Sequence, residues 1–362
     1  MTERNDIAVE TVDLTKNYGP VVALRSINLT ISSSQYFVLL GPSGGGKTTL
    51  LRLIGGFLKP TAGRILLHGR DVSDLPPNER PTSMVFQSYA LFPHMNVARN
   101  VGYGLKLRRM AQADIRDKVN SMLQLVGLVG LNERMPHELS GGQQQRVQLA
   151  RSLVLDSDIL LLDEPLASLD AKLRKDMCLE LKHIQEKVGI TFLHVTHNQE
   201  EAMTIADHIA IIADGNLVEE ATPEEIYRNP RARFTAEFIG ERNMLHGRVV
   251  ESDGGETGVD LGHATVRVPT GGNVVERGTK VSLSIPSEYL SFDSGAADDM
   301  ERLPGTFVER FYLGLTTNDV VRLADGTDVL VRSLAADSRR DLVQGAQVTV
   351  AWKRRDARLH SY

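Results

Sequence analysis

The distribution of apolar and polar positions predicts a largely parallel sheet in the first part of the chain. Five short runs are apolar without alternation, at residues 36–40, 84–86, 159–162, 192–195 and 209–212. Strands that are covered by helices on both faces have this continuous apolarity. Stretches with helical spacing lie between the runs, and one of them carries Leu173, Met177, Leu181, Ile184 and Val188. We therefore predict an α/β domain in which helices cover a mostly parallel sheet.

Two further regions interrupt this pattern. Alternating runs over about residues 7–35, broken by turn residues at 17–20, predict a small antiparallel N-terminal sheet, and residues 64–72 fit a second hairpin. The region from about residue 95 to 155 is rich in helical patterns. It predicts a helical subdomain inserted into the α/β domain.

The pattern changes to short strands and turns after about residue 240. Just before it, Thr222-Pro223-Glu224-Glu225 has the form of a capping box with proline at the first helical position, and residues 234–239 predict a last helix. Alternating runs follow at 265–268, 280–285 and 347–352, and Asp325-Gly326 joins two more in a hairpin. We predict two domains, an α/β domain at 1–240 and a small, barrel-like all-β domain at 241–362.

Composition places the chain among ordinary globular proteins. Its 362 residues are 41 % hydrophobic and 24 % charged, and the net charge of −5 argues against a long nucleic-acid footprint. The single cysteine, Cys178, excludes an internal disulfide framework and is typical of a reducing cytosol. The N-terminus lacks the apolar core of a signal peptide, and no apolar stretch reaches the roughly 20 residues that span a bilayer. We expect any membrane step to require another chain.

Residues 41–49 match the phosphate-loop pattern of a glycine, four residues and Gly-Lys-Ser/Thr. An apolar strand precedes the loop and a helical pattern follows, which is the context that the pattern requires. Glycines let consecutive backbone N–H groups point at one anion, and the helix start adds partial positive charge. Lys47 is expected to neutralise the β- and γ-phosphates, and Thr48 to reach Mg²⁺. The expected phosphate contacts are Gly41, Pro42, Ser43, Gly44, Gly45, Gly46, Lys47, Thr48 and Thr49.

Polar side chains follow three of the buried runs, where the strands of a parallel sheet share one edge. Asp163 is placed to hold the hydration shell of Mg²⁺, and Glu164, next to it, to polarise an attacking water. His197 could hydrogen-bond to the γ-phosphate, and Gln87 could reach the metal or the water. A solvated acidic turn and a structural histidine are the competing interpretations. With the loop, these residues predict water attack on a phosphate, with Mg²⁺ bound by Thr48, Gln87 and Asp163.

A second anion site is predicted at Ser140-Gly141-Gly142-Gln143. Ser140 and Gln143 have capping-box spacing, so a helix begins here. The two glycines leave backbone N–H groups exposed at the helix start, although a plain helix cap would explain the serine and glutamine equally well. One phosphate loop and two phosphate-binding sites in one chain indicate that two chains face each other.

Together these motifs resemble the ATP-binding-cassette (ABC) ATPases over about residues 7–240. The phosphate loop, Gln87, residues 139–143, residues 162–165, Ser168-Leu169-Asp170 and His197 occur in the order and approximate spacing of that family. The resemblance implies two cassettes closing head to tail around two ATP molecules, with Ser140, Gly141, Gly142 and Gln143 of one chain completing the site of the other. It also implies that Tyr18 stacks on adenine, whereas the residues alone suggest an aromatic at a turn.

Within that family the chain is similar to importer ATPases that carry a C-terminal oligonucleotide-fold-like β domain. Residues 86–95, 140–147 and 196–202 resemble the spermidine/putrescine type, and ferric-iron, sulfate and sugar importers share much of this pattern. Two segments depart from the pattern of that family. Ala167-Ser168 has the common Ser and Ala in exchanged order, and residues 285–288 lack the usual Arg-Pro-Glu.

The resemblance implies a homodimer on the cytoplasmic face of the inner membrane, bound to two permease subunits and indirectly to a solute-binding protein. A groove between the sheet domain and the helical insertion, near residues 89–95, would receive a short permease helix. Nucleic acid is not an expected partner. The competing hypotheses are a non-transport ATPase acting on DNA or ribosomes, which usually has a long coiled-coil insertion or two cassettes, and a nucleotide-binding regulator whose β domain carries the function.

Overall fold

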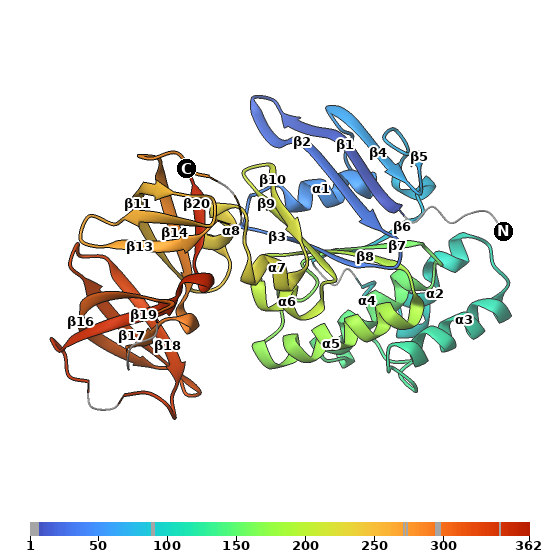
Figure 1. Cartoon of the computed structure of the whole chain (residues 1–362). Helices are drawn as coiled ribbons and strands as arrows, with labels where there is room; N and C mark the ends of the chain where they lie inside the picture. The colour runs from blue at the N-terminus through green and yellow to red at the C-terminus, as the bar shows by residue number, and fades with distance from the viewer. Residues whose placement is uncertain (1–6, 88–90, 271, 273, 294–297, 340–341) are drawn as a thin grey trace. The chain divides into compact units, whose positions relative to one another are not determined.

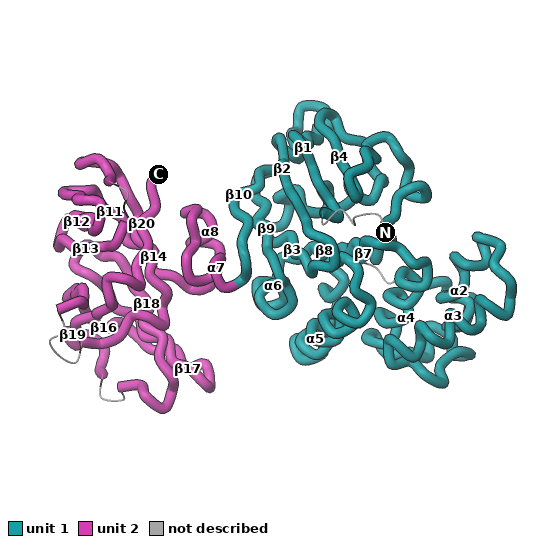
Figure 2. The backbone as a smooth tube through the Cα atoms, turned by 45° about the vertical axis from the view of Figure 1, so that its right-hand side comes forward, with its two compact units in different colours: residues 1–223 teal, residues 224–362 magenta. Residues whose placement is uncertain are grey.

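The computed structural model describes residues 7–87, 91–270, 272, 274–293, 298–339 and 342–362 (Figure 1). It forms two compact units, residues 1–223 and 224–362, which are coloured separately in Figure 2. Each unit has its own apolar core. No helix in the described ranges has both the length and the apolarity that crossing a bilayer requires.

The first unit is built around a six-stranded sheet with the order β10-β9-β3-β8-β7-β6. Its strands are β3 (Tyr36–Leu40), β6 (Thr82–Val85), β7 (Ile159–Asp163), β8 (Thr191–Thr196), β9 (His208–Ala213) and β10 (Asn216–Ala221). The first five are parallel, and β10 pairs antiparallel with β9. The predicted parallel sheet is confirmed. Because its strands are parallel, the residues that follow β3, β6, β7 and β8 emerge at one edge.

An antiparallel sheet with the order β2-β1-β4-β5 packs on one side of this unit, as the N-terminal pattern predicts. Its strands are β1 (Ile7–Tyr18), β2 (Val21–Ser32), β4 (Ala62–Leu67) and β5 (Arg70–Asp71). One core joins Leu14, Leu24 and Ile27 of this sheet to Phe37 and Leu39 of β3. Helix α1 (Lys47–Ile54) contributes Leu50, Leu51, Leu53 and Ile54 to the same core. The helix that follows the phosphate loop is therefore held between two sheets (Figure 1).

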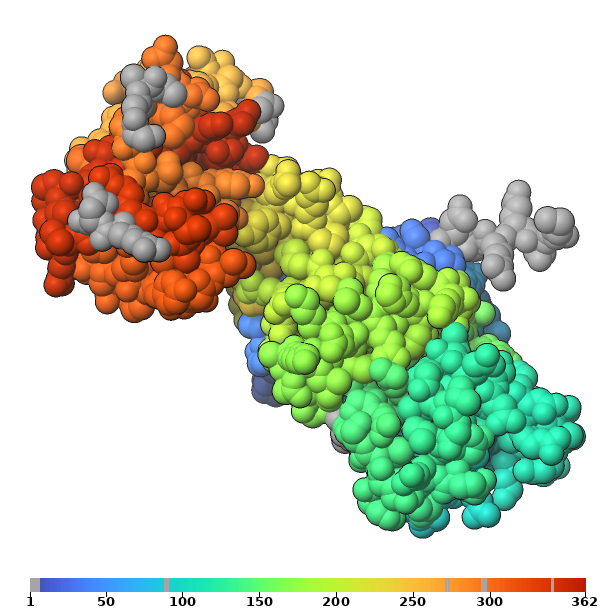
Figure 3. All heavy atoms as spheres, turned by 90° about the horizontal axis from the view of Figure 1, so that it is seen from below, coloured from blue at the N-terminus to red at the C-terminus, as the bar shows by residue number. Residues whose placement is uncertain are grey.

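The remaining helices of the first unit are α2 (Val97–Leu107), α3 (Gln112–Leu125), α4 (Gly141–Leu153), α5 (Ala171–Val188) and α6 (Gln199–Ile205). The first three contact one another and form the predicted helical insertion, seen from below as the teal and green lobe in Figure 3. Helix α5 lies across the sheet from α1 and buries Met177, Cys178, Leu181 and Ile184 (Figure 1). Burial raises the pKa of the Cys178 thiol to about 12, so this residue is a packed core residue rather than a reactive one.

The second unit begins with helices α7 (Pro223–Arg228) and α8 (Arg233–Phe238) and continues as an all-β domain. One sheet has the order β13-β12-β11-β14-β20, with β11 Arg242–Ser252, β12 Glu256–Asp260, β13 Thr265–Pro269, β14 Lys280–Pro286 and β20 Arg358–Ser361. The other has the order β15-β19-β16-β17-β18, with β15 Ser291–Phe292, β16 Met300–Tyr312, β17 Thr316–Leu323, β18 Asp328–Leu334 and β19 Gln347–Lys353. Both sheets enclose one core that includes Trp352. The predicted hairpin at Asp325-Gly326 joins β17 to β18.

The units divide at residue 223, whereas the change in composition places the boundary at 240. Helices α7 and α8 belong with the second unit because they contact other parts of that unit. Tyr227 of α7 donates a hydrogen bond from its hydroxyl to Glu288 Oε1 at 2.7 Å, and α8 contacts β11 and β14. The sequence pattern changes where the local structure stops being helical, at residue 238. The boundary between the units instead reflects tertiary packing.

Candidate functional site

The loop between β3 and α1 can be formed only by glycine at its tightest points. A Cβ on Gly41 would lie 2.0 Å from the backbone oxygen of Ile212, and one on Gly45 would lie 2.8 Å from the same atom. Gly46 has φ +109° and is the N-cap residue of α1. At the start of helix α1, the backbone N–H groups of Lys47 and the residues after it therefore have no partner within the helix, which is the geometry of an anion site.

Lys47 is held at the centre of this loop by backbone carbonyls. Its Nζ donates hydrogen bonds to Gly41 O at 2.9 Å and to Pro42 O at 2.8 Å. Burial lowers the pKa of the Lys47 ammonium, while the charges of Glu164 and Asp163 raise it. The loop thus presents a buried, oriented positive charge, as a nucleotide phosphate requires. The carboxylates of Glu164 and Asp163 lie near this charge.

Thr48 and Asp163 meet where β7 ends beside α1. The Thr48 Oγ1 donates to Asp163 Oδ1 at 3.0 Å, and Arg52 Nη2 lies 3.6 Å from Asp163 Oδ2. Burial raises the pKa of Asp163, and the bonds from Thr48 and Arg52 partly oppose this shift. Arg52 was not predicted, although it stands four residues after Thr48 and so lies on the same helix face.

This hydroxyl and carboxylate suit Mg²⁺, which prefers hard oxygen ligands and keeps several waters. Within the described ranges no three His, Cys, Asp or Glu residues gather into a metal-binding group, so these two side chains would supply only part of a coordination shell. Phosphate oxygens and water would complete it. Gln87 is exposed two residues beyond the end of β6, at the strand edge shared with Asp163.

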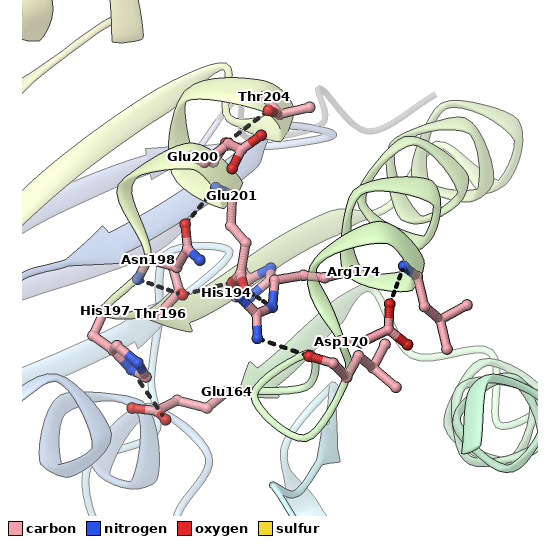
Figure 4. Close-up of polar contacts among 12 residues, drawn as sticks. Glu164, Asp170, Arg174, His194, Thr196, His197, Asn198, Glu200, Glu201 and Thr204 are labelled. Atoms are coloured by element: carbon pink, nitrogen blue, oxygen red, sulfur yellow. Dashed lines mark hydrogen bonds and ion pairs between the residues drawn. The ribbon is translucent and has the colours of Figure 1, made fainter. Parts of the chain in front are cut away.

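Glu164 and His197 form a pair at the same edge. His197 Nδ1 lies 3.3 Å from Glu164 Oε2, with side-chain exposures of 52 % and 20 % (Figure 4). Glu164 has φ +46°, a left-handed conformation that is uncommon for a residue with a side chain. Its backbone N–H donates to Val195 O at 3.0 Å, which ties the residue after β7 to β8. The fold therefore holds the backbone of Glu164 in a strained conformation, as is typical of functional sites.

The predicted capping box at the start of α4 is confirmed. Gln143 N donates to Ser140 Oγ at 3.4 Å, and Ser140 N donates to Gln143 Oε1 at 3.0 Å. In the parts of the chain that the structure describes, no hydrogen bond joins this helix start to the phosphate loop. Gly141 and Gly142 occupy the first helical positions, whose N–H groups have no partner within the helix.

Tyr18 lies at the end of β1, beside the turn to β2, and is 47 % exposed. Lys16 Nζ lies 5.2 Å from the centre of its ring. The same hairpin approaches the phosphate loop, because a Cβ on Gly46 would lie 2.7 Å from the Ala23 oxygen in β2. Tyr18 is therefore an exposed aromatic side chain on the hairpin that contacts the start of α1.

Comparison with known proteins identifies the two units. Residues 24–167 match the ABC transporter family, and residues 280–359 match the TOBE domain family. The spermidine/putrescine import ATP-binding protein PotA of Thermobifida fusca is 44 % identical over 353 residues, which cover 96 % of this chain and 91 % of the relative. This chain belongs to the ATP-binding proteins of ABC transporters. It is the ATPase of an ABC importer, and its ATP hydrolysis is coupled to transport.

Other relatives of this ABC ATPase differ in their named solute. PotA 1 of Pseudomonas aeruginosa is 47 % identical over 334 residues, covering 89 % of this chain and 87 % of the relative. The Fe(3+) ions import ATP-binding protein FbpC 1 of Rhizobium meliloti is 41 % identical over 343 residues, covering 95 % of both. The resemblance to ABC importer ATPases is confirmed at the level of family, fold and activity.

Two solved structures resemble the cassette. CbiO1 from Clostridium perfringens, part of the ABC transporter complex cbiONQ, is 29 % identical with a TM-score of 0.58, covering 61 % of this chain and 90 % of that one. The ATP-binding cassette MJ0796, solved as a dimer in a post-hydrolysis state with ADP and Pi, is 31 % identical with a TM-score of 0.53, covering 59 % of this chain and 98 % of that one.

Proposed function

We propose that this ABC ATPase drives the import of spermidine or putrescine, or of a related small solute, through separate permease subunits at the cytoplasmic face of the membrane. The PotA relatives support the polyamine assignment, and the FbpC relative makes ferric iron the principal alternative. Importers of sulfate or sugar remain further alternatives.

The observation that carries the proposed mechanism is the Glu164–His197 pair beside the phosphate loop. In this mechanism ATP binds with its phosphates at Gly41–Thr49 and its adenine against Tyr18. Glu164 accepts a proton from a water whose oxygen bonds to the γ-phosphorus, while the bond to the bridging oxygen breaks and releases ADP. His197 donates a hydrogen bond to the γ-phosphate and holds Glu164 in place.

Magnesium would be held by Thr48, Asp163 and Gln87, and it would neutralise negative charge on the phosphates. Lys47 adds the positive charge of its side chain at the β- and γ-phosphates. The loop carbonyls that hold Lys47 leave its remaining hydrogen-bond donor for phosphate oxygen.

A second copy of the chain completes the site in this proposal. The N–H groups of Gly141 and Gly142 at the start of α4 have no partner within the helix, and no hydrogen bond of the described residues joins this helix start to the phosphate loop of its own chain. Ser140, Gly141, Gly142 and Gln143 would therefore contact the γ-phosphate bound by the partner. The dimeric state of the MJ0796 structure supports this arrangement. ATP then favours the closed dimer because it makes these contacts only there.

The proposed permease contact is a groove beside α2 and α3, which lies within the helical insertion rather than between the insertion and the sheet. Tyr89 and Ala90 of the expected segment lie outside the described residues, whereas residues 91–95 are described. The groove has a volume of about 1130 Å³, and its lining includes Met95, Arg99 and Tyr103. Buried Asn100 holds the backbone of residues 92–95 beside the groove, since its side chain donates to Phe92 O at 3.1 Å and to Met95 O at 2.9 Å. A short permease helix would bind here.

Two experiments test the proposal. Glu164→Gln should bind ATP, form a stable dimer and lack hydrolysis, and a variant that hydrolyses ATP at the wild-type rate would reject Glu164 as the base. Co-purification with the permeases, followed by ATPase assays with solute-binding proteins loaded with spermidine, putrescine or Fe³⁺, tests the solute. Stimulation by Fe³⁺ and by neither polyamine would reject the polyamine assignment.

A further inference from the structure

An ion pair between half-buried Arg174 and buried Glu201 lies beside Glu164 and His197. Arg174, in the first turn of α5, contacts two segments at once. Its Nη2 donates to Leu169 O at 2.8 Å, and its Nε lies 3.4 Å from Glu201 Oε1 (Figure 4). The Arg174 side chain therefore bridges the segment that follows Glu164 and the helix that follows His197.

The segment between Glu164 and Arg174 is a series of hydrogen-bonded turns. Ala167 N donates to Glu164 O at 3.3 Å, and Leu169 N donates to Leu166 O at 3.1 Å. Asp170 then caps α5 by accepting a hydrogen bond from Leu173 N at 3.0 Å. The Arg174 side chain is therefore linked to the backbone of Glu164 through a short segment with internal hydrogen bonds.

On the other side, Glu201 holds the backbone around His197. Its Oε2 accepts a hydrogen bond from Thr196 Oγ1 at 2.6 Å, and that hydroxyl accepts one from Asn198 N at 3.0 Å. Asn198 Oδ1 in turn accepts a hydrogen bond from Glu201 N at 3.1 Å, which caps α6. The residues immediately before and after His197 are thus both tied to Glu201.

The Arg174 guanidinium partly offsets the burial of the Glu201 carboxylate. The Glu201 side chain is 5 % exposed, and burial raises its pKa, while the bond from Thr196 and the charges of Arg174 and His197 lower it. His194 lies 3.9 Å from Glu201 but is fully buried, and burial lowers its pKa to about 3, so it stays neutral. Removing the guanidinium would leave Glu201 as a buried carboxylate without its permanent cationic partner.

Both pairs line one small cavity of about 40 Å³. Glu164 and His197 form one part of its wall, and Arg174 and Glu201 form another. A cavity of this size with polar walls has room for an ordered water. The Arg174–Glu201 pair is therefore adjacent to the proposed reaction groups without occupying the phosphate loop.

We propose that Arg174 and Glu201 are positioning residues for ATP hydrolysis, and that their ion pair sets the placement of Glu164 relative to His197. This inference rests on the proposed roles of Glu164 and His197. The pair holds the segments that carry the base and the histidine at a fixed separation. Loss of the pair should slow the chemical step and leave the phosphate contacts of ATP in place.

The test compares steady-state ATP hydrolysis by full-length Arg174→Met, Arg174→Lys, Glu201→Gln and the Arg174→Met/Glu201→Gln double variant. We expect kcat to fall about 10- to 100-fold in Arg174→Met and in Glu201→Gln, because misplacement by about 1 Å has costs of this order, with KM for ATP changed less than about threefold. Arg174→Lys should recover part of kcat. The double variant should be no slower than the slower single variant, since both changes remove one interaction.

Lys182→Met is the matched control. Lys182 is on the same helix and pairs with Asp207 Oδ1 at 2.6 Å, with no contact to the segments that carry Glu164 and His197 among the described residues. Its kcat should stay within about twofold of wild type.

Wild-type kcat in Arg174→Met and Glu201→Gln would overturn the inference, as would independent, additive losses in the double variant. An equal loss of kcat in Lys182→Met would also overturn it, since the effect would then reflect stability. Glu201→Gln is nearly isosteric and keeps an acceptor for Thr196, so it supplies the test if Arg174→Met unfolds. If Glu164→Gln hydrolyses ATP at the wild-type rate, the proposed function is rejected instead. If Glu164→Gln is inactive and the Arg174 and Glu201 variants keep the wild-type kcat, only this inference is rejected.

Discussion

Replacing Gly41 by alanine should disrupt the phosphate loop through one defined collision. The added Cβ would lie 2.0 Å from the backbone oxygen of Ile212 in β9, whereas contacts of this kind are rarely shorter than 3.0 Å. The loop must therefore move by about 1 Å away from β9. A flexible side chain could yield, but the opposing atom is backbone in the interior of a sheet.

The expected size of the effect has two parts. Gly41 has φ +154°, and holding alanine there should cost about 1 to 3 kcal/mol, while the overpacking should add about 1 to 3 kcal/mol. A total of about 4 kcal/mol in a unit of this size corresponds to a fall in Tm of about 8 to 16 °C. The shift also moves the carbonyls of Gly41 and Pro42 that hold Lys47, so ATP affinity should fall about 10- to 100-fold.

Gly44→Ala is the control in the same loop. Gly44 has φ +80°, and a Cβ there meets nothing within 4 Å. Only the backbone strain of about 1 to 2 kcal/mol remains, which predicts a much smaller fall in Tm. Thermal unfolding of both variants, with and without a nonhydrolysable ATP analogue, separates the two contributions. Equal Tm and equal nucleotide affinity in the two variants would refute the steric argument.

Three further predictions follow from single side chains. Lys47→Ala should retain the fold and lose ATP hydrolysis by at least about 100-fold, measured as phosphate release; normal turnover would contradict the assigned role of Lys47. Asn100→Leu should lower the free energy of unfolding by about 2 kcal/mol and weaken permease binding in pull-down assays, because the Phe92 and Met95 carbonyls lose their donor. His194, whose folded pKa of about 3 lies below its ordinary value, contributes stability that is present above about pH 6.5 and is lost as pH falls toward 3. His194→Gln should therefore reduce the loss of stability between pH 6 and 4 in urea titrations, and an unchanged acid slope would exclude this contribution.

Local patterns were sufficient to predict the phosphate loop, the parallel strands and the helix start at Ser140. Each depends on interactions between residues close in sequence, such as the capping box between Ser140 and Gln143. The nearness of Glu164 to His197 was also accessible, because parallel strands place their carboxyl ends at one edge. The sequence carried no comparable signal for the pairing of Arg174 with Glu201, since a charged residue on a helix usually faces solvent.

The sequence by itself determined the family, the ATPase activity and the residue types at the phosphate loop, because glycine at sites of close backbone approach and a lysine at the helix start are local requirements. Only the tertiary structure decided three other features: the left-handed backbone of Glu164, the assignment of α7 and α8 to the second unit, and the ion pair between Arg174 and Glu201. Each of these depends on contacts between elements that are separate in the chain. Burial and pairing across such contacts are set by packing, which no local pattern encodes.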